Sequence, residues 1–192
     1  MENSTLFHRS FPLRSVALDA GVVFAGAGIM AIAAQMQIPL APVPITLQTL
    51  ALMVISAALG ARRAALTQSA YLLAGLCGAP VFAGLKSGPA ALLGPTGGYL
   101  LAFIPSAFLI GMLAQRGWDK SLMKSAGMML LGSLIVWLLG SIHLSLYVGG
   151  FSQALALGVL PFLPGDAVKI ALAAGFLPGI WTLVQNYLPQ KD

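Results

Sequence analysis

The sequence predicts an all-α integral membrane protein with six transmembrane helices and both termini in the cytoplasm. Hydrophobic residues make up 58% of the chain and charged residues only 8%, and the mean hydropathy is +0.91. A soluble domain has roughly 25% charged residues, so this chain would have too little charged surface to remain in water. The apolar runs are long and continuous and do not alternate with period two, which excludes a transmembrane β-barrel.

The first three helices are expected in the N-terminal part of the chain. Residues 16–36 form an apolar run that is long enough to cross a bilayer and that ends before a cluster of prolines. This run is also longer than the hydrophobic core of a signal peptide, so we predict a first transmembrane helix and not a cleaved leader. Residues 45–59 and 64–77 form the next two helices, which end at Gly60 and before Gly78.

The other three helices are expected at residues 98–113, 123–147 and 166–187, so that residues 1–192 form a single six-helix membrane domain. A long loop at residues 81–97 precedes the fourth helix. The stretch from Val81 to Leu100 contains five glycines, two prolines and one lysine, whereas a connection between two helices usually needs only about two to eight residues. The extra length predicts that this outer loop has a function of its own.

The basic residues orient the six helices. If the helices alternate in direction, eight of the ten basic residues fall on one side of the membrane. That side is the cytoplasmic one by the positive-inside rule. The eight residues are Arg9, Arg14, Arg62, Arg63, Arg116, Lys120, Lys124 and Lys191.

The two remaining basic residues, Lys86 and Lys169, fall on the outer side together with Asp166. Asp166 and Lys169 are three residues apart and therefore share a helix face. Ionisable residues in membrane segments are costly and are usually functional. Two structural alternatives remain open, in which Asp166 caps the last helix and Lys169 extends to the lipid surface.

Further polar and aromatic residues are expected near this outer end. Gln48 and Thr49 lie at the start of the second helix, and the Gln48 side chain can both donate and accept hydrogen bonds, as an amide or urea ligand requires. The glycines around Thr96 permit a close backbone approach to a ligand. Tyr99 and Tyr147 lie near the outer ends of the fourth and fifth helices, where an interfacial aromatic belt is the alternative explanation.

Several functional classes are excluded. The chain has no GxSxG or GxxxxGK[ST] motif and no histidine near the outer polar residues, so we predict that it is not an enzyme. His8 and His143 lie far apart in the sequence and Cys77 is the single cysteine, so no metal site and no internal disulfide are expected. The net charge of +5 is scattered among apolar segments, and nucleic acid is therefore not an expected partner.

The first helix carries a small-residue pattern. Ala17, Gly21 and Ala25 are spaced by four residues, and small residues at this spacing let another helix approach closely. The neighbour is either a helix of the same bundle or a partner protein. At the cytoplasmic edge of this helix, Asp19 is expected to pair with Arg14.

Four sequence motifs resemble the BioY family, the biotin-binding S components of energy-coupling-factor (ECF) transporters. They are APVPITLQTLAL, VFAG, LLGPTGGYLLAF and FLPGDAVK, and they occur in this order along the chain. The resemblance implies the six-helix S-component fold with an outward pocket for biotin and no cofactor. It also implies a transmembrane T subunit and two ABC-type ATPases as partners in the cytoplasmic (inner) membrane, with docking of the T subunit onto Ala17, Gly21 and Ala25.

The resemblance also indicates pocket residues. Gln48, Asp166 and Lys169 are expected to serve the urea ring of biotin, Phe82 and Tyr99 the tail, and Lys86 or loop N–H groups the carboxylate, with the loop as a gate. The complete predicted ligand-binding set is Gln48, Thr49, Phe82, Gly84, Lys86, Thr96, Tyr99, Tyr147, Asp166 and Lys169. Three alternatives remain, namely an S component for thiamine or riboflavin, a stand-alone facilitator, and a membrane enzyme acting on lipids.

Overall fold

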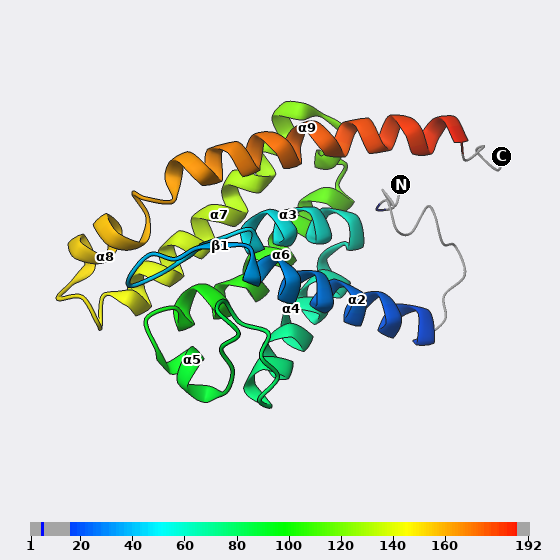
Figure 1. Cartoon of the computed structure of the whole chain (residues 1–192). Coiled ribbons are helices and arrows are strands. Elements are labelled where there is room, and N and C mark those ends of the chain that lie inside the picture. The colour runs from blue at the N-terminus through cyan, green and yellow to red at the C-terminus, as the bar shows by residue number, and fades with distance from the viewer. Residues whose placement is uncertain (1–4, 6–15, 188–192) are drawn as a thin grey trace.

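The computed structural model describes Thr5 and residues 16–187, with side chains up to Ile180 and at Thr182. It confirms a helical fold with a helix at each of the six predicted places (Figure 1). These helices are α2 (Val16–Gln35), α3 (Gln48–Leu59), α4 (Ala61–Leu76), α6 (Gly97–Gln115), α7 (Leu122–Leu144) and α9 (Leu163–Tyr187).

Short elements connect the long helices. The strands β1 (Gln37–Ile38) and β2 (Ile45–Thr46) pair antiparallel between α2 and α3. The remaining short elements are α5 (Pro89–Leu93) within the long loop, η1 (Trp118–Lys120) between α6 and α7, and α8 (Phe151–Gly158) before α9. All of these short elements except β2 lie in stretches that were predicted to be loops, and β2 occupies the predicted start of the second helix.

Several predicted helix boundaries were wrong by about three residues. The second helix begins at Gln48 and not at residue 45, because Ile45 and Thr46 pair with β1. The third helix begins at Ala61, directly after Gly60, and the fifth ends at Leu144 because the next residues form turns. The last helix begins at Leu163, three residues before the predicted start.

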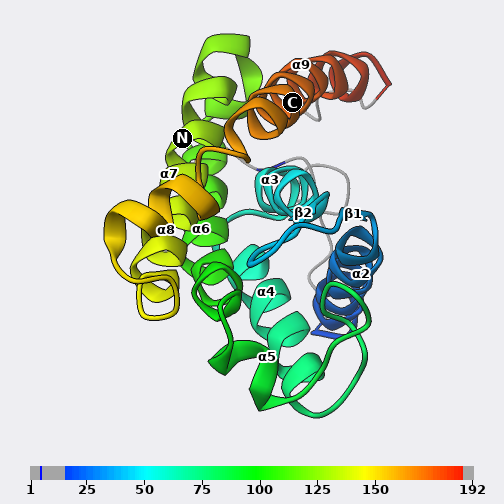
Figure 2. The same cartoon turned by 60° about the vertical axis from the view of Figure 1, so that its left-hand side comes forward.

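The helices differ in length. In the described part of the chain, four helices are long and apolar enough to cross a membrane: Val16–Gln35, Gly97–Gln115, Leu122–Leu144 and Leu163–Ile180. The helices α3 and α4 have 12 and 16 residues, fewer than the roughly 20 that a full span requires. Both pack against α6, and α3 also packs against α2 and α9 (Figure 2).

Close helix packing depends on small residues. A Cβ atom at Gly111 of α6 would lie 2.4 Å from the backbone of Gly60 and Ala61. The turn between α3 and α4 therefore lies directly against the C-terminal part of α6. In the absence of a strong hydrophobic effect between helices in lipid, such close contact provides much of the packing energy.

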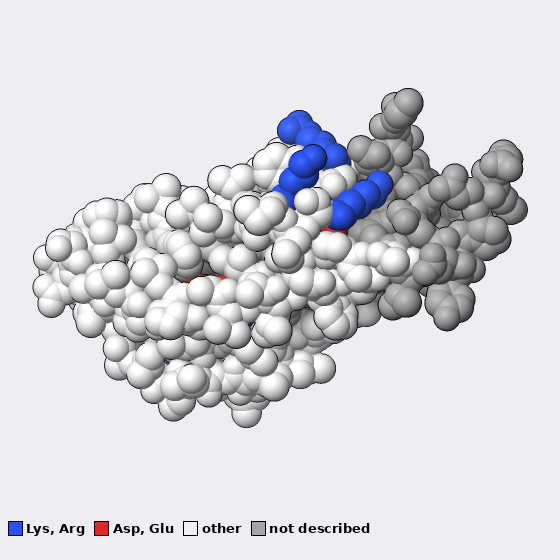
Figure 3. All heavy atoms as spheres, turned by 90° about the horizontal axis from the view of Figure 1, so that it is seen from above, with Lys and Arg blue, Asp and Glu red and all other residues white. Residues whose placement is uncertain are grey.

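The contact between the α3–α4 turn and α6 also brings basic residues together. Arg62 and Arg63 follow the turn at Gly60, and Arg116, Lys120 and Lys124 follow the C-terminal end of α6. Lys and Arg side chains accordingly gather toward one end of the molecule in the view from above (Figure 3). This placement agrees with the predicted alternation of the helices. Arg9, Arg14 and Lys191 lie outside the described residues.

Asp19 forms an ion pair with Arg63, whereas the sequence predicted a pair with Arg14. Arg63 Nη2 and Nε lie 2.7 Å and 3.0 Å from Asp19 Oδ1, and this ion pair joins α2 to α4. The predicted partner, Arg14, lies outside the described residues. The pair connects residues that are 44 positions apart, which the local sequence does not reveal.

Candidate functional site

A cavity lies between the long loop and the helices, at the end of the bundle away from the basic turns. It encloses about 740 Å³ of space, a figure that includes the open solvent at its mouth. The loop, the β2–α3 segment and helices α6, α7 and α9 all contribute to its wall. The predicted site residues that line it are Gln48, Thr49, Phe82, Lys86, Thr96, Tyr99, Asp166 and Lys169.

A buried ion pair forms one wall of the cavity. Asp166 and Lys169 stand in the first two turns of α9 with exposed fractions of 1% and 6%. Lys169 Nζ lies 2.9 Å from Asp166 Oδ1, and it also donates to the Thr46 carbonyl at 2.8 Å and to Thr49 Oγ1 at 2.9 Å. An ammonium group has three donors, so the protein itself satisfies all of them.

The Asp166 carboxylate also accepts hydrogen bonds from the protein at both of its oxygens. Thr49 donates its hydroxyl proton to Oδ1 at 3.2 Å, and Trp137 Nε1 donates to Oδ2 at 2.9 Å. The capping alternative for Asp166 is wrong, because α9 begins three residues earlier and the carboxylate binds side chains. The alternative in which Lys169 extends to the lipid surface is also wrong, since its ammonium group is buried in this network.

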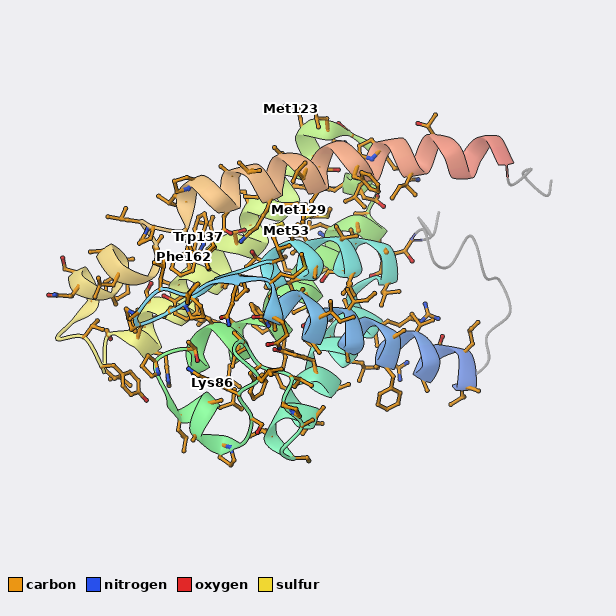
Figure 4. All side chains as sticks on the ribbon, viewed as in Figure 1. Met53, Lys86, Met123, Met129, Trp137 and Phe162 are labelled. Atoms are coloured by element: carbon orange, nitrogen blue, oxygen red, sulfur yellow. The ribbon has the colours of Figure 1, made fainter. Side chains whose placement is uncertain are left out.

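Trp137 is a cavity residue that the sequence analysis missed. It lies in the middle of the apolar helix α7, and Figure 4 shows it close to Phe162, which precedes α9. One feature of the sequence could have indicated it. A tryptophan N–H in a membrane segment needs an acceptor, and the chain has only five acidic residues to provide a charged one.

Gln48 forms a second polar part of the wall. It is 3% exposed, and its Nε2 donates to the Tyr71 hydroxyl at 2.8 Å while its Oε1 accepts from Thr46 Oγ1 at 3.1 Å. One Nε2–H of Gln48 has no partner among the described residues, since an amide nitrogen carries two protons. Because both its amide oxygen and its amide nitrogen form hydrogen bonds, the Gln48 side chain has a fixed orientation.

Aromatic rings cover the apolar part of the cavity. Tyr99 stacks on Phe162 with ring centroids 6.3 Å apart, and its hydroxyl donates to the Gly158 carbonyl at 2.9 Å. Phe82, on the loop side, is 2% exposed and meets the ring of Tyr71 edge-on at 5.5 Å. The other apolar lining residues are Val43, Pro44, Ala83, Ala91, Leu100, Phe103 and Val136.

Two predicted site residues do not line the cavity. Gly84 lies in the turn of the loop with φ of +71°, and its neighbours Ala83 and Lys86 line the cavity instead. Tyr147 follows the end of α7, is 46% exposed, and donates its hydroxyl proton to the Leu93 carbonyl. Tyr147 therefore contacts the far end of the loop from outside the cavity.

The remaining features of the site concern charge and metals. Lys86 lies on the loop side of the cavity, where it is exposed, and it forms no ion pair with the described residues (Figure 4). Among these residues, no three His, Cys, Asp or Glu side chains come together as a metal site would require.

The small-residue face of α2 lies away from the cavity. Ala17, Gly21 and Ala25 are all exposed, and no described residue lies within 4 Å of the position of a Cβ at Gly21. The opposite face carries the buried residues Gly26 and Met30 and packs against α3 and α4. Packing within the bundle therefore does not explain the small residues on the exposed face.

Comparisons with known proteins agree with this architecture. The model of the BioY family matches residues 5–186. The chain is 38% identical over 157 residues to a protein of Thermotoga maritima named biotin transporter BioY, covering 82% of this chain and 90% of the relative. A probable biotin transporter BioY of Pyrococcus horikoshii is 37% identical over 157 residues, with 82% and 92% covered.

A solved structure shows the same fold. The crystal structure of the S-component for biotin from an ECF-type ABC transporter matches with a TM-score of 0.78 and 26% sequence identity. The match covers 92% of this chain and 100% of that one.

Proposed function

The chain belongs to the BioY family, and we therefore propose that it binds biotin outside the cell as the substrate-specific component of an ECF-type transporter. One observation carries the proposal. A buried Asp166–Lys169 pair, held by hydrogen bonds from the protein, faces a cavity whose remaining wall is largely aromatic and aliphatic. This arrangement suits a ligand with one compact polar ring and an apolar body.

The polar wall offers complementary groups to a cyclic urea. Gln48 keeps one free N–H that can donate to the urea oxygen. Asp166 Oδ2 accepts from Trp137 and retains a lone pair for a urea N–H. Lys169 has no donor left, so its role is to hold Asp166 in place.

The other parts of biotin match the rest of the cavity. Phe82, Tyr99 and Phe162 present apolar surface to the thioether ring and the tail. Lys86, at the loop side of the cavity, is available for the carboxylate. Residues 81–97 would close over the bound vitamin and move aside when it is released.

The transport step requires partners. The chain is a multi-pass membrane protein, and we infer that it resides in the cytoplasmic membrane with its basic end inside. The exposed face of Ala17, Gly21 and Ala25 supports docking of a transmembrane T subunit. Two ATPase subunits would then supply the energy, and the chain itself would act as a non-catalytic binding subunit.

Titration of the purified protein in detergent tests the binding proposal. Trp137 lines the cavity, so tryptophan fluorescence can be followed together with heat, using thiamine and riboflavin as control ligands. Saturable one-to-one binding of biotin alone is expected. A folded protein that does not bind biotin would contradict the proposal.

Transport in liposomes tests the role of the partners. Biotin uptake is expected only when the T subunit and the ATPases are present and ATP is supplied. Equilibration of biotin through the chain alone would favour a stand-alone facilitator.

A further inference from the structure

The N-terminal part of the long loop is held by two polar side chains that do not line the cavity. We propose that Tyr71 of α4 and Gln35 of α2 are positioning residues that hold residues 81–85 closed over the ligand. The inference rests on the proposed function in that the loop is taken to cover biotin. Neither residue belongs to the cavity wall, so each would act only through the loop.

Tyr71 connects the cavity wall to the loop backbone. Its side chain is 1% exposed, and its hydroxyl accepts from Gln48 Nε2 at 2.8 Å and donates to the Val81 carbonyl at 3.2 Å. A tyrosine hydroxyl has one proton to donate and can accept at the same time. Tyr71 therefore joins Gln48, which would contact the ligand, to the first residue of the loop.

Gln35 holds the next part of the loop from the other side. Its Nε2 donates to the Phe82 carbonyl at 3.1 Å, and its Oε1 accepts from the Leu85 N–H at 3.1 Å. Leu85 has φ of +55°, a conformation that non-glycine residues rarely adopt. The bond from Gln35 thus holds the turn at its least favourable residue.

The aromatic ring of Phe82 fits between these two attachments. It meets Tyr71 edge-on, and its tip lies against Gly75, where a Cβ would come within 2.1 Å of the ring. A hydrogen bond from the Phe82 N–H to the Lys86 carbonyl, at 3.0 Å, also stabilises the turn within the loop. Because Phe82 also lines the cavity, any release of the Tyr71 and Gln35 bonds would uncover the ligand.

Each attachment is a neutral hydrogen bond to loop backbone. Such bonds contribute little compared with a buried ion pair, so they can break and re-form without unfolding the helices. Tyr71 and Gln35 belong to different helices and both donate to the Val81 carbonyl, Gln35 at 3.5 Å, while Gln35 alone also binds the backbone of Phe82 and Leu85. Removing either one is expected to raise the open fraction, and removing both is expected to raise it further.

Cysteine labelling measures the opening directly. Cys77 is exposed, so the parent carries Cys77→Ser together with Ala83→Cys, which introduces a thiol into the cavity wall. The rate of maleimide labelling is measured without biotin. Tyr71→Phe, which keeps the ring, and Gln35→Leu are each expected to accelerate labelling roughly three- to tenfold, as the loss of one or two neutral hydrogen bonds implies.

A matched control separates loop opening from general loosening. Ser106→Ala removes a buried hydroxyl that donates to the Gly132 carbonyl at 2.9 Å between α6 and α7. It is expected to leave the labelling rate unchanged. Equal acceleration by Ser106→Ala, or unchanged rates in both Tyr71→Phe and Gln35→Leu, would overturn the inference.

Biotin release provides the second measurement. Both variants are expected to release biotin several-fold faster with little change in the association rate. If the unsubstituted protein failed to bind biotin, the proposed function would be wrong, while the labelling rates would still report on the loop. If the parent bound biotin and neither labelling nor release changed, the proposed function would stand and the role of Tyr71 and Gln35 would be refuted.

Discussion

The two sides of the cavity are built in different ways. The helix side contains Asp166 and Lys169 in a network of charge-assisted hydrogen bonds between α3, α7 and α9. The loop side is held by neutral bonds from Tyr71 and Gln35 to backbone groups. Breaking a buried ion pair costs about 3–5 kcal/mol, whereas a neutral hydrogen bond contributes only about 0.5–1.5 kcal/mol.

This difference separates recognition from access. The helix side has its donors and acceptors already in place, so it needs no rearrangement when a ligand arrives. The loop side can open at low energetic cost, because only a few neutral bonds and one aromatic contact must be released. A binding protein that must also release its ligand needs both properties, and here they belong to different parts of the cavity.

The largest effect is expected from Lys169→Met. The change leaves Asp166 buried without its counter-ion, which should destabilise the protein by about 3–5 kcal/mol and abolish biotin binding. Thermal unfolding in detergent and a biotin titration measure the two effects. Unchanged stability and affinity would show that the ion pair does not organise this side of the cavity.

A double variant sharpens this first test. Asp166→Asn with Lys169→Met removes both charges, and replacing a buried pair as a whole is often close to neutral for stability. The double variant is therefore expected to recover stability without recovering biotin binding. Recovery of binding would assign the pair a purely structural role.

The next effect is expected from Trp137→Phe. This change removes the N–H donor to Asp166 Oδ2, and hydrogen bonds to charged groups contribute about 1.5–3 kcal/mol. Biotin affinity is expected to fall by at least about tenfold, as measured by calorimetry. Trp118→Phe is the matched control, because Trp118 does not line the cavity, and it should bind biotin normally.

A steric change tests the loop side. Gly75→Ala would place a Cβ 2.1 Å from the ring of Phe82 and force the ring and the loop outward, with a cost of about 1–3 kcal/mol. Faster biotin release is the expected result, measured by chase with unlabelled biotin. Gly175→Ala, at a helix position with nothing within 4 Å, is the control and should leave release unchanged.

The smallest effect is expected from Lys86→Gln. Lys86 is exposed at the cavity, where an ion pair is screened and contributes at most about 1 kcal/mol, so biotin affinity should fall by no more than about fivefold. The difference from the parent should vanish for biotin amide, which lacks the carboxylate, and at high salt. Lys124→Gln, at the basic end, is the control, and a similar loss there would exclude a specific role for Lys86.

Much of the fold could be predicted from the sequence because its signals are local. The six helices and the long loop follow from runs of apolar residues and from the glycines and prolines between them. The boundaries were less accurate, as at Ile45, which pairs with Ile38 in a strand. Such pairing depends on a second segment of the chain, so the residues of the predicted second helix do not reveal it.

The part of the site that was predicted correctly also has a local signal in the sequence. Asp166 and Lys169 stand out because charge is rare in a membrane segment, whereas Trp137 and Tyr71 look like ordinary apolar-helix residues. Gly84 was included because it lies in the loop and Tyr147 because it lies near the outer end of the fifth helix, but which of these residues faces the cavity depends on the backbone turns. Gln35 was missed because nothing near it in the sequence indicates that it contacts the loop.

The sequence by itself determined the membrane class, the places and order of the six main helices, and the end at which the basic residues gather. These properties depend on composition and on spacing over one or two turns. Tertiary structure alone decided which polar atoms meet. Gln35 reaches a residue 47 positions away and Thr49 one that is 117 positions away, and such partners are set by how the helices pack.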